Sequence, residues 1–277
     1  MKRNFLIYYL LAFTFLNTVA NNENSSDGYK EILCELKPIV RNPSRIIKTR
    51  KTYPHLPFEI NKGTSQNWAG YIAFGSVLKA SVSFVTGTWN VPTVLPTNGN
   101  SYSSIWVGID GYSSSTVEQL GTEHDWINGK QQNYAWFEMY PNYAYQITGF
   151  PVNIGDSITA SVKYKGNNVF VLSIANNTKK VSTTIPTNKT VSNIAQRSSA
   201  EWVVEAPFST AILPLSHFAN VNFTKCTTII NGLSGSINKN SWKNNALNMV
   251  TSIGQPKAIT SNLNSDGQNF NVSWKHQ

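Results

Sequence analysis

The chain has 277 residues, 40% of them hydrophobic and 13% charged, and a formal net charge of +9. That length is enough for a well-buried core and, in an all-β chain, for a single domain. Two cysteines do not make a disulfide framework or a zinc cluster, and the body from residue 63 onward, with 13 basic and 9 acidic residues, is too nearly balanced for a nucleic-acid-binding domain.

Residues 1–20 predict a secretory signal peptide. Lys2 and Arg3 precede a mostly apolar run, and small residues before position 21 offer a cleavage site. The apolar run is shorter than the roughly 20 residues that a membrane span needs, which makes a membrane anchor the weaker alternative. We therefore expect a secreted or periplasmic protein with no membrane association after cleavage.

Residues 21–62 predict a prosegment or linker, because a polar stretch is followed by four prolines that break any long helix. Six basic residues and no acidic one lie between Lys37 and Lys51. Two interpretations stay open: a solvated flexible arm, or a basic prosegment that covers an acidic cleft. The sequence does not decide whether Cys34, in this segment, pairs with Cys226 in the body.

Residues 63–277 predict an all-β domain. Short β-rich runs such as WAGYIAF, VFVLSIA and NFNVSW are separated by Gly, Pro, Asn and Ser turns. No stretch keeps a helical period beyond two turns, although residues 246–250 suit a short helix as well as a strand. Many short strands at this spacing are typical of a β-sandwich or barrel.

Alternation along three of these runs predicts a polar face. Gln119 shares a face with Glu123, Glu138 shares one with neighbouring aromatic residues, and Glu201 shares one with Glu205. The opposite face of each run is largely apolar. We expect a curved sheet with its core on the convex side and a polar, aromatic groove on the concave side.

The body contains few carboxylates on which acid–base chemistry can draw. They are Asp110, Glu118, Glu123, Asp125, Glu138, Asp156, Glu201, Glu205 and Asp266. The sequence has neither the G-x-S-x-G elbow of serine hydrolases nor the H-E-x-x-H motif of zinc proteases. A Ser–His–Asp triad depends on geometry and stays undecided. Because the histidines are scattered, we expect no metal and no cofactor.

Six motifs in order closely resemble the glutamic peptidases, or eqolisins. They are NWAGYIAF at 67–74, VTGTWNVP at 85–92, WVGIDG at 106–111, EQLGTE at 118–123, YAWFEMYPNYAY at 134–145 and AEWVVE at 200–205. The resemblance extends from about residue 66 to about residue 223. Six ordered motifs are far more specific than any single short pattern.

The resemblance implies a concanavalin-like β-sandwich of two antiparallel, seven-stranded sheets and an acid-acting, pepstatin-insensitive endopeptidase with a glutamine–glutamate dyad. The dyad falls on Gln119 and Glu205, with Glu201 as the alternative if the register is different. The implied substrate-binding residues are Trp68, Trp106, Asp110, Glu123, Trp136, Glu138 and Tyr140. We expect a monomer that acts on polypeptides and is made as a zymogen.

The chemistry of these residues agrees with such roles. A carboxylate at Glu205 can take a proton from water and pass it to the leaving nitrogen. The Gln119 amide can orient the water and stabilise the oxyanion. Two other functions stay open on the residues alone: a glycoside hydrolase that uses Glu138 with Glu205 or Glu123, and a lectin-like module whose aromatic residues bind sugar.

Overall fold

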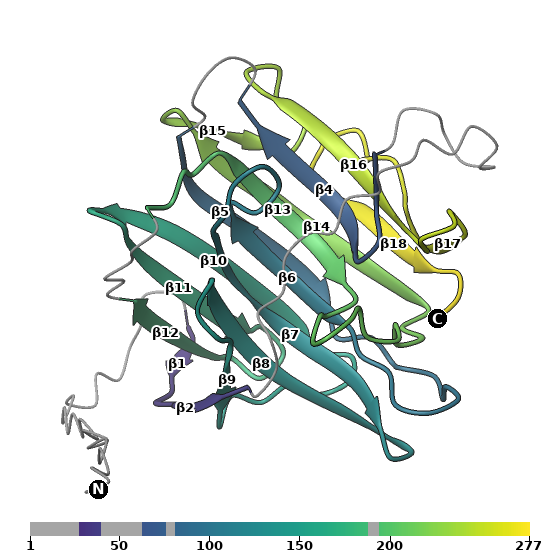
Figure 1. Ribbon diagram of the computed structural model, residues 1–277. Helices are drawn as coiled ribbons and strands as arrows, with labels where there is room; N and C mark the ends of the chain where they lie inside the picture. The colour runs from purple at the N-terminus through teal and green to yellow at the C-terminus, as the bar shows by residue number, and fades with distance from the viewer. Residues whose placement is uncertain (1–27, 40–62, 76–80, 188–193) are drawn as a thin grey trace, which may run out of the picture.

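The computed structural model describes residues 28–39, 63–75, 81–187 and 194–277 (Figure 1). All regular secondary structure in these ranges is β-strand, and none of them holds a helix long and apolar enough to cross a membrane. The all-β prediction is confirmed, and residues 246–250 lie in a strand. The predicted signal peptide lies outside the described residues, as does the predicted basic arm from residue 40 onward.

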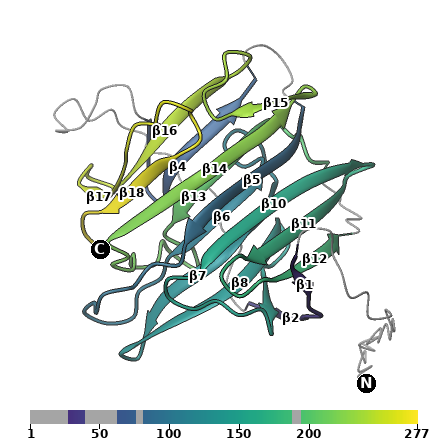
Figure 2. The same cartoon turned by 180° about the vertical axis from the view of Figure 1, so that it is seen from behind.

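Two sheets pack face to face (Figures 1 and 2). Sheet 1 faces the viewer in Figure 1 and contains, in spatial order, β2 (Glu35–Pro38), β9 (Tyr145–Thr148), β8 (Lys130–Tyr140), β7 (Val117–Ile127), β6 (Ser104–Ile109), β13 (Ser199–Glu205), β4 (Trp68–Phe74), β16 (Lys243–Val250) and β3 (Gly63–Ser65). The seven strands from β9 to β16 are antiparallel, as the resemblance implied.

Sheet 2 faces the viewer in Figure 2. It contains β1 (Lys30–Glu31), β12 (Val181–Thr187), β11 (Val169–Asn176), β10 (Ser157–Gly166), β5 (Val82–Asn90), β14 (Asn220–Ile230), β15 (Leu233–Ser236) and β18 (Phe270–Trp274). One further strand, β17 (Pro256–Thr260), pairs with β16 of sheet 1 and β18 of sheet 2, and so joins the sheets along one edge.

The main core lies between the two sheets. Along β6 and β13, every second side chain points into it, which buries Val107 and Trp202 completely against the second sheet. The intervening side chains, among them Trp106 and Glu201, lie on the outer face of sheet 1. The predicted alternation therefore matches the structure, and it places the polar face where the sequence analysis expected a groove.

Part of the predicted prosegment belongs to the sandwich. The strand β1 pairs in parallel with β12 of sheet 2, and β2 pairs with β9 of sheet 1. We call residues 28–39 the leader. Two further hydrogen bonds of 2.9 Å hold it: the main-chain amide of Lys30 donates to the carbonyl oxygen of Lys180, and that of Ile39 donates to the carbonyl oxygen of Ala144. Gly28–Ile39 thus extends an edge of each sheet, which a linker would not do.

The two cysteines do not pair in the structure. Cys34 is half-buried in the leader between β1 and β2, and Cys226 is completely buried in β14. Burial raises the pKa of both thiols, and it does so more strongly for Cys226. Two free thiols that differ this much in exposure should also differ in reactivity.

Candidate active site

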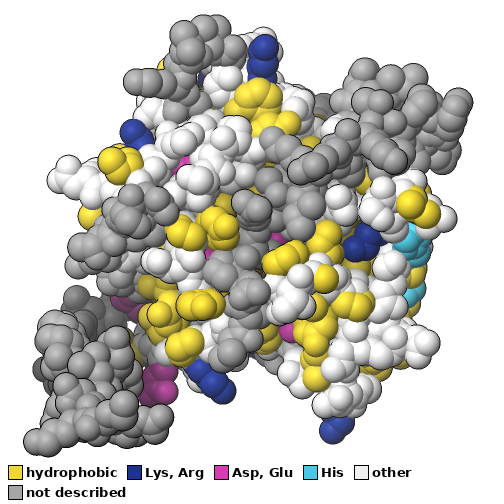
Figure 3. Space-filling view, viewed as in Figure 1, with side chains coloured by type: hydrophobic (Ala, Val, Ile, Leu, Met, Phe, Trp, Pro, Cys, Tyr) yellow, Lys and Arg dark blue, Asp and Glu magenta, His cyan; other side chains and the backbone are white. Residues whose placement is uncertain are grey.

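Four neighbouring strands bring the polar residues together on the outer face of sheet 1. Strand pairing places Glu201 of β13 opposite Gly108 of β6, Gly108 opposite Gln119 of β7, and Gln119 opposite Glu138 of β8. These four residues form one row across the sheet, which we call the glutamine row. Figure 3 looks onto this face and shows several patches of apolar side chains on it, with a few acidic side chains visible near them.

Glu205 lies in a different row. It is opposite Ser104, which is opposite Glu123. Four residues along a strand correspond to about 13 Å, so Glu205 stands well away from Gln119 along the groove. The prediction that Glu205 faces Gln119 therefore does not agree with the register, because β13 is aligned so that the alternative, Glu201, occupies that place.

Gly108 lies between Gln119 and Glu201 in the glutamine row and has little room for a side chain. A Cβ atom at this position would come within 3.0 Å of the Trp106 ring and 3.2 Å of the Gln119 Cβ. Because Gln119 and Glu201 are two strands apart, their Cα atoms are separated by about 10 Å.

The amide of Gln119 has a defined orientation. Its Nε2 donates a hydrogen bond of 2.5 Å to Oε2 of Glu138, whereas its Oε1 is buried and has no hydrogen-bond partner among the described residues. The Glu138 contact thus leaves the carbonyl end of the amide available to accept a hydrogen bond.

Glu201 is buried, and neither of its carboxylate oxygens makes a well-formed hydrogen bond in the described part of the chain. Burial raises the pKa of Glu201 well above its ordinary value, and the nearby carboxylates of Asp110 and Glu118 raise it further. The Ser199 hydroxyl and the main chain of Tyr112 lie near enough to offset part of that shift. Perturbed, unsatisfied carboxyl groups of this kind are typical of functional sites.

Glu205 is held by its surroundings instead. Its Oε1 accepts a hydrogen bond of 3.2 Å from Nδ2 of Asn67, and its Oε2 accepts one of 2.9 Å from Nε1 of Trp106. In the NWAG motif, the resemblance implied a site role for Trp68 and none for Asn67, which the structure places on Glu205. In the same row, the Ser104 hydroxyl donates to Oε1 of Glu123 at 2.6 Å.

Asp110 holds the start of β13 in place. Its carboxylate accepts hydrogen bonds from the main-chain amides of Arg197 at 2.6 Å and Ser198 at 2.8 Å, and from the Ser198 hydroxyl at 2.8 Å. Glu201 comes three residues after Ser198 in the sequence. The hydrogen bonds of Asp110 therefore help to fix the position of Glu201. Its φ angle of 72° is one that aspartate adopts more readily than most residues.

Aromatic side chains surround the glutamine row. Trp68 and Trp106 pack edge to face with ring centroids 4.9 Å apart, and Trp136 belongs to the same cluster, with Tyr140 packed against it. The indole N–H groups of Trp68 and Trp136 are buried without a hydrogen-bond partner among the residues described. Buried indole donors usually find a partner, so these two are available to an acceptor on a bound molecule.

No group of three or more His, Cys, Asp or Glu side chains is placed to hold a metal ion in the described ranges. The acidic residues of the site lie in a row of strands with amide, hydroxyl and indole partners. This arrangement offers carboxyl groups and hydrogen-bond donors, which are the groups that hydrolysis by an activated water requires.

Comparisons with known proteins agree with this chemistry. A family model described as the peptidase A4 family matches residues 66–274. Aspergillopepsin-2 of Aspergillus niger is 28% identical over 212 residues, which cover 69% of this chain and 74% of that protein. Scytalidopepsin B of Scytalidium lignicola is 31% identical over 182 residues, which cover 62% of this chain and 66% of that protein.

A solved structure shows the same fold. The crystal structure of scytalido-glutamic peptidase with a peptide-based transition-state analogue matches with a TM-score of 0.65 and 24% identity, over 76% of this chain and 98% of that one. The concanavalin-like sandwich that the motifs implied is therefore confirmed.

Proposed function

This chain belongs to the peptidase A4 family of glutamic endopeptidases, and we propose that it hydrolyses polypeptides at acid pH through a dyad of Gln119 and Glu201. The observation that carries the proposal is the glutamine row: an amide oxygen and a carboxylate, both buried and unsatisfied in the described residues, belong to residues on either side of Gly108 in one row of the sheet. Family membership favours this function over the glycoside hydrolase and lectin alternatives.

In the proposed mechanism, a water molecule lies over Gly108 and donates hydrogen bonds to Oε1 of Gln119 and to the Glu201 carboxylate. Because the pKa of Glu201 is raised, its ionised form is the minor one in acid; that form takes a proton from the water while the water oxygen forms a bond to the peptide carbonyl carbon. The second Nε2 hydrogen of Gln119 stabilises the oxyanion of the tetrahedral intermediate. Glu201 then gives its proton to the leaving nitrogen as the C–N bond breaks, which returns the dyad to its starting state.

The burial of the carboxylates supports activity at acid pH. Seven of the nine carboxylates of the body lie buried on or directly after β6, β7, β8 and β13: Asp110, Glu118, Glu123, Asp125, Glu138, Glu201 and Glu205. Burial and the neighbouring carboxylates of Asp110 and Glu118 raise the pKa of Glu201, so its carboxyl holds a proton in acid and can give one to the leaving nitrogen.

The position of the leader supports the proposal that the protein is made as a zymogen. The side chain of Ile39 packs against the aromatic cluster beside the dyad, and the predicted basic arm follows it in sequence. We propose that residues 1–20 direct secretion and that the arm from residue 40 pairs with groove carboxylates until acid protonates them. A chain that begins near residue 61 should then be active without an acid-activation lag. Identical activity of the two forms at neutral and acid pH would contradict this.

The dyad is tested by hydrolysis of an unfolded protein from pH 2 to 7 in the presence of pepstatin. We expect Gln119→Ala and Glu201→Gln each to lower turnover by about 10²–10³ or more. Glu205→Gln is the matched control, since it makes the same change in the neighbouring row, and we expect it to keep most of the activity. Thermal unfolding of each variant checks that the fold is intact.

Two results would overturn parts of this assignment. An inactive Glu205→Gln beside an active Glu201→Gln would return the role to Glu205, as the motif comparison first implied. No cleavage by the folded protein, with or without its leader, would remove the peptidase assignment itself.

A further inference from the structure

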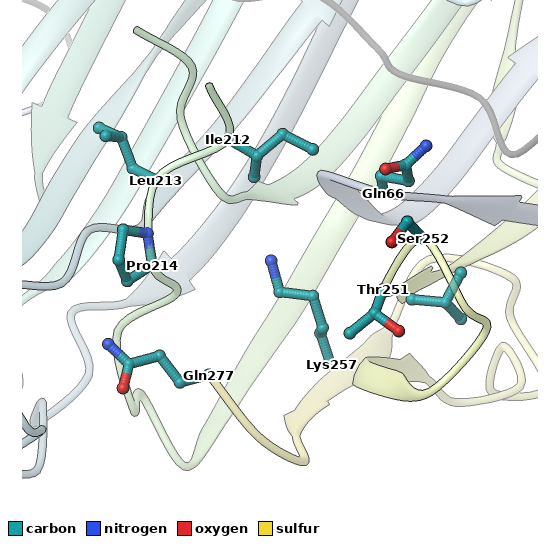
Figure 4. Close-up of a pocket in the computed structure, with 9 residues that line it drawn as sticks. Gln66, Ile212, Leu213, Pro214, Thr251, Ser252, Lys257 and Gln277 are labelled. Carbon is teal, nitrogen blue, oxygen red and sulfur yellow. The ribbon is translucent and has the colours of Figure 1, made fainter. Parts of the chain in front are cut away.

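A second cavity lies beyond the Glu205 end of the groove. It has a volume of about 490 Å³ and is lined by Gln66, Ile212, Leu213, Pro214, Val250, Thr251, Ser252, Lys257 and Gln277. Figure 4 shows the Lys257 side chain rising from β17 with its amino group directed into this space. We call it the Lys257 pocket.

The ammonium group of Lys257 lacks a partner. Only 8% of the residue is exposed, and it makes no ion pair or side-chain hydrogen bond in the described part of the chain, the end of the chain at Gln277 included. Burial lowers the pKa of Lys257 to about 8, so the group is still a cation at neutral and acid pH. A buried cation with no counter-charge is unfavourable, and an anion in the pocket would relieve that cost.

The rest of the lining suits a carboxylate on an apolar stem. The Gln66 amide and the hydroxyl groups of Thr251 and Ser252 can donate hydrogen bonds to carboxylate oxygens. Thr251 Oγ1 already accepts from the main-chain amide of Gln255 at 3.0 Å, which leaves its hydroxyl hydrogen to donate. The apolar side chains, among them Ile212, fit the methylene groups that lead to the carboxylate (Figure 4).

Both walls of the pocket continue into the groove. Gln66 immediately precedes Asn67, whose side chain donates to Glu205. On the other wall, the main-chain amide of Leu213 donates to the carbonyl oxygen of Pro207, two residues after Glu205. From the Glu201 row to Gln66 is about 20 Å along the strands, or about six residues of extended peptide.

We propose that the Lys257 pocket binds a carboxylate of the polypeptide substrate, several residues from the bond that is cut. The carboxylate belongs either to a Glu or Asp side chain or to the C-terminus of a short substrate. This inference rests on the proposed function of the groove. The other charged or titratable groups in or near the pocket in the described chain are the basic side chains of Lys275 and His276 and the α-carboxylate of Gln277, which makes no ion pair with Lys257.

The test uses neutral peptides of about 14 residues with one cleavable bond. Each carries either Glu or Gln at a single position, four to eight residues to either side of that bond, and a further pair ends in a free acid or an amide. At pH 5, we expect the wild-type protein to cleave the best-placed Glu peptide with a kcat/KM about tenfold higher than that of its Gln twin. At pH 3 the preference should shrink, because the peptide carboxyl, with an ordinary pKa of about 4.3, is then protonated.

Lys257→Met should remove the preference without changing kcat/KM for the Gln peptides. Lys275→Met, an exposed lysine close by with the same change in charge, is the matched control and should keep the preference. Preference for the acid peptide over the amide alone would assign the pocket to a C-terminal carboxylate. Equal cleavage within every pair, or a preference that survives in Lys257→Met, would overturn the proposal and leave the peptidase intact.

Binding gives a readout that does not depend on turnover. In calorimetry with the Gln119→Ala protein at pH 5, the Glu peptide should bind with a Kd about tenfold lower than the Gln peptide, and the difference should vanish when Lys257→Met is added. Equal Kd values would overturn the pocket even if no peptide were cleaved. Absence of cleavage with intact selective binding would count against the dyad and not against the pocket.

Discussion

Replacing His124 by glutamine should make the folded protein more resistant to acid. His124 lies in β7 and is completely buried, with its Nε2 2.8 Å from the Thr122 hydroxyl and its Nδ1 3.1 Å from Oδ1 of Asn133. Thr122 also accepts a hydrogen bond from the Trp89 indole at 2.9 Å. This donor pattern assigns the proton to Nδ1, with Nε2 as an acceptor, so the imidazole is neutral. Burial lowers the pKa of His124 to about 4, although Asn133 and Glu123 act in the opposite direction.

The size of the effect follows from that shift. In the unfolded chain the imidazole has a pKa of about 6.5, so below this pH the unfolded state takes up a proton that the folded state refuses until about pH 4. Stability is therefore intact above pH 6.5, declines as the pH falls toward 4, and stays reduced below that. A difference of about 2.5 pKa units corresponds to about 3 kcal/mol, a large part of a typical stability of about 5–15 kcal/mol.

The measurement is the free energy of unfolding in urea at pH 7, 5 and 3 for the wild-type protein and for His124→Gln. At pH 7 we expect the variant to be the less stable, because it loses buried hydrogen bonds worth about 1 kcal/mol each. Between pH 7 and pH 3 the difference should move by about 3 kcal/mol in favour of the variant. His276→Gln, near the end of the chain, is the control. A difference that stays constant with pH would refute the reasoning.

Three other changes test particular contacts. Gly108→Ala should lower kcat/KM at least tenfold, because the new methyl group comes against the side chain of Gln119. The free energy of unfolding should fall by only about 1–3 kcal/mol. Enzyme kinetics and urea unfolding measure the two effects. A chain starting at residue 40 should unfold with about 2–4 kcal/mol less free energy than one starting at residue 28, since each lost main-chain hydrogen bond of β1 and β2 contributes about 1 kcal/mol. In the folded protein, iodoacetamide should alkylate Cys34 and leave Cys226 unmodified, as peptide mass spectrometry would show; equal labelling would contradict the burial of Cys226.

Strand alternation explains why so much of the site could be predicted. Side chains along a strand point alternately to opposite faces, so a local pattern is enough to place Gln119, Glu138 and Glu201 on one face. The same rule places Glu205 on that face too. Which glutamate stands opposite Gln119 depends on how β13 is aligned with β6 and β7, and nothing within the AEWVVE motif encodes that alignment. The register came from the structure.

The leader shows the same limit at a sheet edge. The strands β1 and β2 are short and their side chains are exposed, so they carry neither the alternation nor the apolar content that predicts a strand. They become strands because β12 and β9 offer unpaired main-chain groups. A sequence reading that looks for proline and charge therefore describes Glu35–Pro38 as a linker, although it completes an edge of sheet 1.

Burial shifts the pKa values of Glu201, on the outer face of sheet 1, and of His124, on the core-facing side of β7, in opposite directions. The raised pKa of Glu201 means that the folded state takes up a proton before the unfolded chain does, so the penalty of this group disappears as the pH falls toward the ordinary carboxyl range. The lowered pKa of His124 introduces a penalty over much the same pH interval. An enzyme that works in acid gains from the first and loses from the second. We infer that the buried hydrogen bonds of His124 to Thr122 in β7 and Asn133 in β8 come at a cost in acid stability.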